Sequence, residues 1–110
     1  MNLNSVCLIG RLGKEPELKY TPSGSAVCSF SIAVEDMPKD GQKVSHWFRC
    51  VCWGKTAEFL VNYAGKGARV AVNGRLSTRS WEKDGAPVTV TEVICNNLEL
   101  IDWKENDDAT

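Results

Sequence analysis

The sequence predicts an all-β protein, a five-stranded Greek-key barrel with one short helix between the third and fourth strands. Two observations lead to this architecture. Hydrophobic and polar residues alternate with a period of two along most of the chain, as in strands that bury one face. This period gives way to helical spacing only between residues 55 and 64. The chain has 110 residues, 43% of them hydrophobic, and fits one domain, which we place at residues 1–103.

The first two strands are expected at residues 6–12 and 26–34. In the first, Val6 and Leu8 face opposite to Cys7 and Ile9, and in the second hydrophobic side chains alternate with serines. Residues 13–21 are expected to form a loop or an irregular extension. Pro22-Ser23-Gly24-Ser25 has the composition of a turn.

A third strand is expected at residues 46–53, after a polar connection at 35–43 that contains Pro38 and Gly41. The alternation predicts one face with Trp47, Arg49, Val51 and Trp53, and an opposite face with Phe48, Cys50 and Cys52. Cysteines beside a phenylalanine indicate that the second face lies in the core.

The short helix is expected at residues 55–64, followed by a fourth strand at 68–79, a hairpin loop at 82–87 and a fifth strand at 88–101. A change of parity places a bulge near Glu92. The fourth strand and its continuation should turn Val70, Val72 and Leu76 to one face and Arg69, Arg75, Arg79 and Trp81 to the other. Strand, strand, strand, helix, strand, strand is the order of elements in the OB-fold.

The face that carries arginines and tryptophans should contact solvent, because burying a row of arginines is unfavourable. Exposed cations suit phosphates and exposed flat rings suit unpaired bases, so this face predicts binding of single-stranded nucleic acid. The candidate stacking residues are Trp47, Trp53 and Trp81, and the candidate phosphate contacts are Arg49, Lys55, Arg75 and Arg79. The alternative for each tryptophan is packing in the core, and Trp103, near the terminus, is expected to pack at a strand end.

The charge distribution supports this interpretation although the net charge is −1. Residues 41–83 hold eight basic residues against two acids, a local balance of +6, and the rest of the chain carries −7. Local potential steers a polyanion more than net charge does.

Other classes of function have little support in the sequence. The five cysteines are odd in number and lack a Cys-x-x-Cys pair, so we expect small buried residues in a reducing cytoplasm. With His46 as its single histidine, the chain is not expected to bind a metal or a cofactor. No carboxylate pair is placed for acid–base chemistry, so no enzyme is expected. Neither a secretory signal nor a membrane span is indicated.

Several segments resemble the bacterial single-stranded DNA-binding protein family, in order and with matching spacing, from Asn4 to about Leu100. They are residues 4–20, residues 24–34, Trp47-Phe48-Arg49, Trp53-Gly54-Lys55-Thr56-Ala57-Glu58, Tyr63 with Lys66-Gly67, and Gly74-Arg75-Leu76-Ser77-Thr78-Arg79-Ser80-Trp81. The resemblance implies an OB-fold that assembles as a homotetramer and wraps single strands in replication, recombination, repair or DNA uptake, associated with the nucleoid. It places the family's stacking aromatics at Trp47, Trp53 and Trp81, and Arg11 is added to the expected DNA-binding residues.

The chain departs from the family pattern in two places. A further aromatic that some members carry after the second strand has no match in Glu35-Asp36-Met37-Pro38. Full-length members also carry a long linker and an acidic tip that recruits repair and replication enzymes, whereas residues 104–110 form only a short acidic stretch, which we expect to be disordered. Recruitment through such a tip therefore has no support here, and both a naturally short form and a truncated one fit the sequence.

Three other interpretations stay open on the residues alone. One is an OB module for protein–protein assembly, like the dimeric primosomal relatives, in which Trp47 or Trp53 would lie in a subunit interface. Another is an RNA- or tRNA-binding OB domain. The last is a cysteine-based redox protein.

Overall fold

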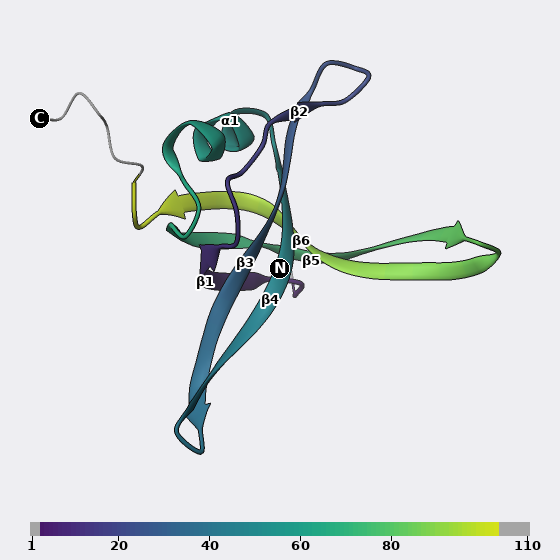
Figure 1. Cartoon of the computed structure of the whole chain (residues 1–110). Coiled ribbons are helices and arrows are strands. Elements are labelled where there is room, and N and C mark those ends of the chain that lie inside the picture. Colours follow the sequence, from purple (N-terminus) through teal and green to yellow (C-terminus); the bar gives the residue numbers. More distant parts are fainter. Residues whose placement is uncertain (1–2, 104–110) are drawn as a thin grey trace, which may run out of the picture.

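Six strands and one helix make up residues 3–103, the part of the chain that the computed structural model describes (Figure 1). In chain order they are β1 (Val6–Leu12), β2 (Lys19–Tyr20), β3 (Ala26–Lys39), β4 (Gln42–Trp53), α1 (Gly54–Tyr63), β5 (Arg69–Lys83) and β6 (Ala86–Leu100). The five long strands and the helix confirm the predicted order. The short β2 adds a strand inside the segment that was expected to be irregular.

The strands close into a barrel. Their order is β1-β5-β6-β4-β3-β2, and the ring is completed because Arg11 and Leu12 of β1 pair with Ala33 and Ile32 of β3. All neighbours are antiparallel except β4 and β6, which run parallel over a short stretch at Cys50 and Val51. The closed five-stranded barrel with a helix between β4 and β5 is the predicted OB-fold arrangement.

The core lies between the barrel strands and α1. Its fully buried side chains include Ile32, Leu60, Val70 and Val93, and α1 contributes Ala57 and Leu60 through their helical spacing. Four of the cysteines, Cys28, Cys50, Cys52 and Cys95, are buried free thiols, as expected. Cys7 is exposed, contrary to expectation, because it lies on the outer face of β1 beside Asn73.

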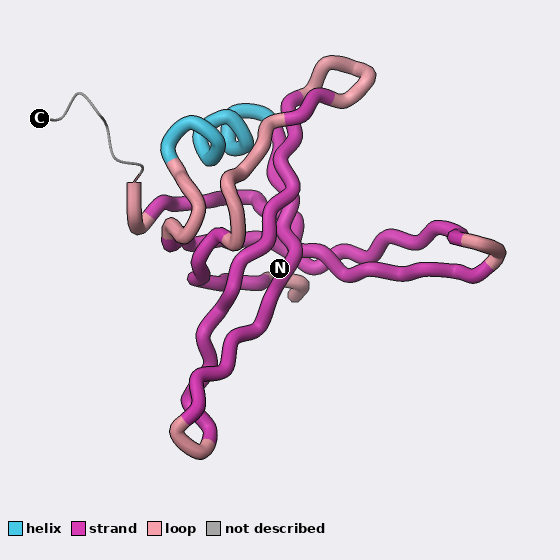
Figure 2. The backbone as a smooth tube through the Cα atoms, viewed as in Figure 1, coloured by secondary structure: helices cyan, strands magenta, loops and turns pink. Residues whose placement is uncertain are grey.

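Two hairpins extend beyond the barrel in different directions (Figures 1 and 2). The expected connection at residues 35–43 is wrong, since β3 continues to Lys39 and turns at Asp40-Gly41 into β4. Cross-strand pairing sustains this polar hairpin, as in the pair Val34 and His46. The second loop is likewise shorter than predicted, with only Asp84-Gly85 between β5 and β6.

The bulge in β6 lies at Asn96 and not near Glu92 as predicted. Pairing with β5 runs without a shift past Glu92 and changes register between Gly74, opposite Cys95, and Asn73, opposite Asn97. Val70 and Val72 are buried as expected, but Leu76 is 45% exposed, although it lies opposite the buried Val93 of β6.

Candidate nucleic-acid interface

One outer face of the barrel runs across β4, β3 and β1. Residues opposite each other in antiparallel strands point to the same side of a sheet. Trp47 lies opposite Ala33, which lies opposite Arg11, so these side chains form one row across three strands. Further along β4, Arg49 lies opposite Ser31. Trp47 and Arg49 of β4 therefore lie beside the small residues Ala33 and Ser31 of β3.

A third row ends on the short strand β2. Trp53 lies opposite Val27, and Val27 lies opposite Lys19. Between the Trp47 row and the Trp53 row the surface is hollowed into a groove of about 220 Å³. The groove is lined by Lys14, Glu17, Lys19, Val27, Ser29, Phe30, Ser31 and Arg49. Its three cations outnumber its one acid, and its polar floor is open to a chain of phosphates.

The tryptophans of this region are solvent-accessible. Trp47 is 62% exposed, Trp53 44% and Trp81 40%, so none of the three packs in the core. The ring of Trp47 lies directly over Gly13, where a β-carbon would approach the indole to 2.7 Å. Trp103 is 58% exposed and meets Phe59 of α1 edge-on, with ring centroids 5.4 Å apart.

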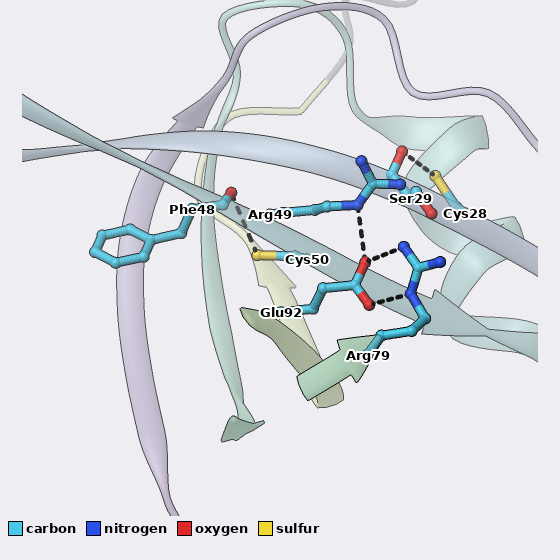
Figure 3. Close-up of polar contacts among 7 residues, drawn as sticks. All are labelled: Cys28, Ser29, Phe48, Arg49, Cys50, Arg79 and Glu92. Carbon is cyan, nitrogen blue, oxygen red and sulfur yellow. Dashed lines mark hydrogen bonds and ion pairs between the residues drawn. The ribbon is translucent and has the colours of Figure 1, made fainter. Parts of the chain in front are cut away.

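Beside the groove, Arg49 and Arg79 converge on one carboxylate, that of Glu92 (Figure 3). Arg49 Nε donates to Glu92 Oε2 at 2.8 Å and Arg79 Nε donates to Oε1 at 3.0 Å. The hydrogen bonds from Arg79 hold the pKa of Glu92 below its usual range, burial opposes them, and Arg49 adds to the lowering. Glu92 is therefore ionised near neutral pH and offsets part of the positive charge of both arginines.

Trp81 is connected to this cluster through Arg79, whose guanidinium carbon lies 5.1 Å from the ring centroid. Both residues lie on the part of β5 that projects from the barrel, on the same side of the hairpin as Arg75. A cation over an indole face is attracted to the ring, so this contact restrains the positions of both Arg79 and Trp81. The structure thus links Trp81 on the hairpin to Arg49 on β4.

Arg11 belongs to a different cluster. Its guanidinium donates to the carbonyl oxygen of Gly67 at 3.1 Å and lies 3.7 Å from Asp102, which Arg69 holds with hydrogen bonds of 3.0 and 3.1 Å. The hydrogen bonds from Arg69 lower the pKa of Asp102 to about 2. Arg11 shares its row with Trp47, yet a carboxylate already offsets part of its charge.

The charge balance of +6 counted over residues 41–83 therefore overstates the positive potential at this surface. Glu92 and Asp102 lie outside residues 41–83 in sequence, but they contact three of the eight cations of that segment. Lys55, in the first turn of α1, and Arg75 differ from these. Within residues 3–103, no carboxylate lies within ion-pair distance of either one.

Sequence reasoning missed three residues of this surface. Lys19 lines the groove because β2 pairs with β3, and a two-residue strand gives too short an alternation to detect. Lys14 lines it from the segment between β1 and β2. Glu92 could have been found, because an acid next to core positions of a strand is rarely buried unless it is paired. The parity change at Glu92 was instead interpreted as a bulge.

No group of three or more histidine, cysteine or acidic side chains in residues 3–103 could hold a metal ion. No helix in that range is long and apolar enough to cross a membrane.

Comparison with known proteins gives consistent matches. Residues 3–101 match the model of a family described as the single-strand binding protein family. The chain is 45% identical to a single-stranded DNA-binding protein of Enterococcus faecalis, over 91% of this chain and 55% of the other. It is also 45% identical to single-stranded DNA-binding protein 3 of Clostridium acetobutylicum, over 92% of this chain and 72% of the other. It thus spans little more than half of the Enterococcus protein.

A solved structure is similar throughout. It is described as a Plasmodium falciparum SSB complex with ssDNA, and it matches with a TM-score of 0.78 and 34% sequence identity. The match covers 96% of this chain and 97% of the other.

Proposed function

The chain belongs to the single-strand binding protein family, and from this premise we propose that it binds single-stranded DNA regardless of base sequence. One observation carries the proposal. Three tryptophans, each at least 40% exposed, alternate with arginines and lysines around a groove and an adjoining hairpin. Rings that stack on any base and cations that meet any phosphate give affinity without reading sequence.

In the proposed path, the single-stranded DNA follows β4 and the groove over β3, and then passes to the β5–β6 hairpin. Trp47 and Trp53 are six residues apart on β4, about 20 Å along an extended strand, which is enough for several nucleotides. Trp81 would stack a further base on the hairpin. Arg49, Lys55, Arg75 and Arg79 would meet phosphates, and Arg11 would do so at the end of the Trp47 row.

The protein acts by binding alone in this proposal, with no catalysed reaction and no cofactor. Because it binds the unpaired form, it opposes hairpins and protects single strands by mass action. We place this activity in replication, repair, recombination or DNA uptake in the bacterial cytoplasm, at the nucleoid. Residues 1–103 form the binding domain, and the short acidic tail expected at residues 104–110 lies outside the described residues.

We also propose a homotetramer. Among the strand pairs of residues 3–103, β1 pairs with β3 only at Arg11 and Leu12, so its edge from Val6 to Ile9 has no paired strand on that side. An open strand edge is a template for pairing with another chain. Ile9, which is 58% exposed, lies with Cys7 and Ala71 at a mostly apolar hollow of about 320 Å³ on the same outer face.

The test is a titration of the protein with a dT oligomer, followed by tryptophan fluorescence and by light scattering. We expect strong quenching, a mass near four subunits and weak competition from duplex DNA. Binding without quenching would contradict stacking and favour an assembly role for the tryptophans. Tighter binding of poly-U than of poly-dT would favour an RNA-binding protein.

Changing Lys19 to Ala tests the groove itself. Loss of one phosphate contact should reduce the slope of log K against log salt concentration by about 0.7 for single-stranded DNA. The matched control is Lys66→Ala, since Lys66 is an exposed lysine on the loop after α1, outside the groove. An equal reduction in both variants would show that only net charge matters and that the groove does not bind the backbone.

A further inference from the structure

Glu92 is an anomaly in a surface that is proposed to bind a polyanion. Its side chain is only 7% exposed, and its negative charge lies between two arginines that are expected to meet phosphates. We infer that Glu92 is a positioning residue, which holds the guanidinium groups of Arg49 and Arg79 in the orientation that the phosphates of single-stranded DNA require. This inference rests on the proposed function.

Both oxygens of the Glu92 carboxylate accept hydrogen bonds from the two arginines. Oε1 accepts from Arg79 Nε at 3.0 Å, and Oε2 accepts from Arg49 Nε at 2.8 Å and from the Arg79 terminal nitrogen Nη2 at 3.4 Å. Each guanidinium is held through its Nε and is thus fixed close to the strand that carries it. Buried as it is, the carboxylate is shielded from an approaching phosphate.

The arginines keep free donors for a ligand. Arg49 uses only Nε, and Figure 3 shows its terminal nitrogens turned away from Glu92. Arg49 also lines the groove, with Ser29 and Ser31 at its floor. The Arg49 and Arg79 side chains are 53% and 55% exposed. A guanidinium that is already ordered loses less rotamer freedom when it forms a phosphate contact.

The ordering extends to a stacking residue. Arg79 lies 5.1 Å from the ring centroid of Trp81, so fixing Arg79 also fixes the cation beside that ring. Glu92 lies on β6, between β4 and β5, and its hydrogen bonds reach one arginine on each neighbour. Glu92 therefore sets the position of Arg79 and Trp81 on the hairpin relative to Arg49 in the groove.

An explanation from charge alone and the positioning role predict opposite effects on DNA affinity when the Glu92 carboxylate is removed. On charge alone, removing a carboxylate from a polyanion-binding surface should strengthen binding. Its repulsion of the phosphates is lost, and it no longer neutralises part of the charge of the two arginines. If Glu92 acts by positioning, the same change should weaken binding. The sign of the effect thus separates the two explanations.

The experiment compares Glu92→Gln, which keeps the shape and removes the charge, with Glu92→Asp, which keeps the charge and shortens the reach. Affinity for a labelled dT oligomer is measured by anisotropy, with folding checked by circular dichroism. Positioning predicts that both variants bind about tenfold more weakly, because two long side chains must then be ordered on binding. Tighter binding by the Gln variant, with unchanged binding by the Asp variant, would overturn the inference.

A second comparison leaves Glu92 intact and so covers the case in which its variants fail to fold. Arg49→Lys keeps the positive charge but loses the Nε anchor, and positioning predicts weaker binding where charge predicts no change. A third comparison does change Glu92, in a background that lacks both arginines. In the double variant Arg49→Gln, Arg79→Gln, the further change Glu92→Gln should cause no further loss of affinity. A full tenfold loss in that background would show that Glu92 does not act through these arginines.

Failure of the inference can be told apart from failure of the proposed function. The unaltered protein is titrated with the same oligomer in each series. If it does not bind, single-stranded DNA binding itself is wrong. If it binds and the variants bind equally well or better, only the role of Glu92 is wrong.

Discussion

Changing Trp47 and Trp81 together to alanine is expected to weaken binding of a dT oligomer by roughly 30-fold or more. Each base that stacks on an aromatic ring contributes about 1–3 kcal/mol, and a tenfold change in affinity corresponds to about 1.4 kcal/mol. Trp47 and Trp81 are 62% and 40% exposed, so truncation should remove little core packing. Anisotropy of a labelled oligomer measures the affinity, because fluorescence quenching would lose two of its reporters.

The control for this prediction is Trp103→Ala. Trp103 is 58% exposed and packs beside Phe59 on α1, away from the groove residues. It should leave the affinity within about twofold of the original, since it removes an exposed ring that is not on the proposed path. Unchanged affinity in the double variant, with a normal unfolding transition, would remove Trp47 and Trp81 from the site.

The barrel could be predicted from sequence because its signal is local. Alternation in β1, β3 and β4 records which side chains face the core, and α1 shows the only helical spacing of the described residues. The same parity placed Trp47, Arg49 and Trp53 on the outer face of β4, where the structure has them exposed. It was wrong for two of their neighbours: Val51, expected on the outer face, is only 7% exposed, and Phe48, expected in the core, is 36% exposed. Whether Trp47, Arg49 and Trp53 contact DNA is a prediction that the titrations above will test.

The hairpin beyond Val34 could not be predicted in the same way. Once β3 and β4 leave the barrel, neither face has a core to pack against, so the hydrophobic alternation ends while the pairing continues. Asp36 and His46 share a hydrogen bond of 2.9 Å across this hairpin. Polar residues that look like a loop in sequence therefore form a strand through partners on the next strand.

The ion pairs of Glu92 and Asp102 with arginines could not be predicted from the sequence either. Glu92 and Arg49 are 43 residues apart, and Asp102 and Arg69 are 33 apart. No local pattern links such residues. They meet because β6 lies between β4 and β5, so a count of charges in one segment could not anticipate which cations would be partly neutralised.

Changing Gly74 to Ala is expected to destabilise the fold by about 3 kcal/mol or more, the upper range for inserting an extra group into a packed site. A β-carbon there would lie 1.9 Å from the carbonyl oxygen of Ile94 and 3.1 Å from the α-carbon of Cys95. Both contacts are with backbone, which can move only if the pairing of β5 with β6 is broken. Gly74 stands next to the register shift at Asn96, and an isolated glycine in a strand often marks a bulge or a close approach.

Urea unfolding followed by circular dichroism measures this effect, and Gly65→Ala is the matched control. At Gly65 the nearest atom to a β-carbon would be the carboxylate oxygen Oε1 of Glu15 at 3.1 Å, which accepts a hydrogen bond from the Lys66 N–H at 2.9 Å. This contact is with a side chain and is longer than the backbone contacts at Gly74, so Gly65→Ala should destabilise the fold less. The hairpin that begins at Gly74 carries Arg75, Arg79 and Trp81, so Gly74→Ala should also weaken DNA binding at urea concentrations where the barrel is still folded. An unchanged unfolding midpoint would show that β6 can yield at Ile94, and that the close approach does not hold the hairpin in place.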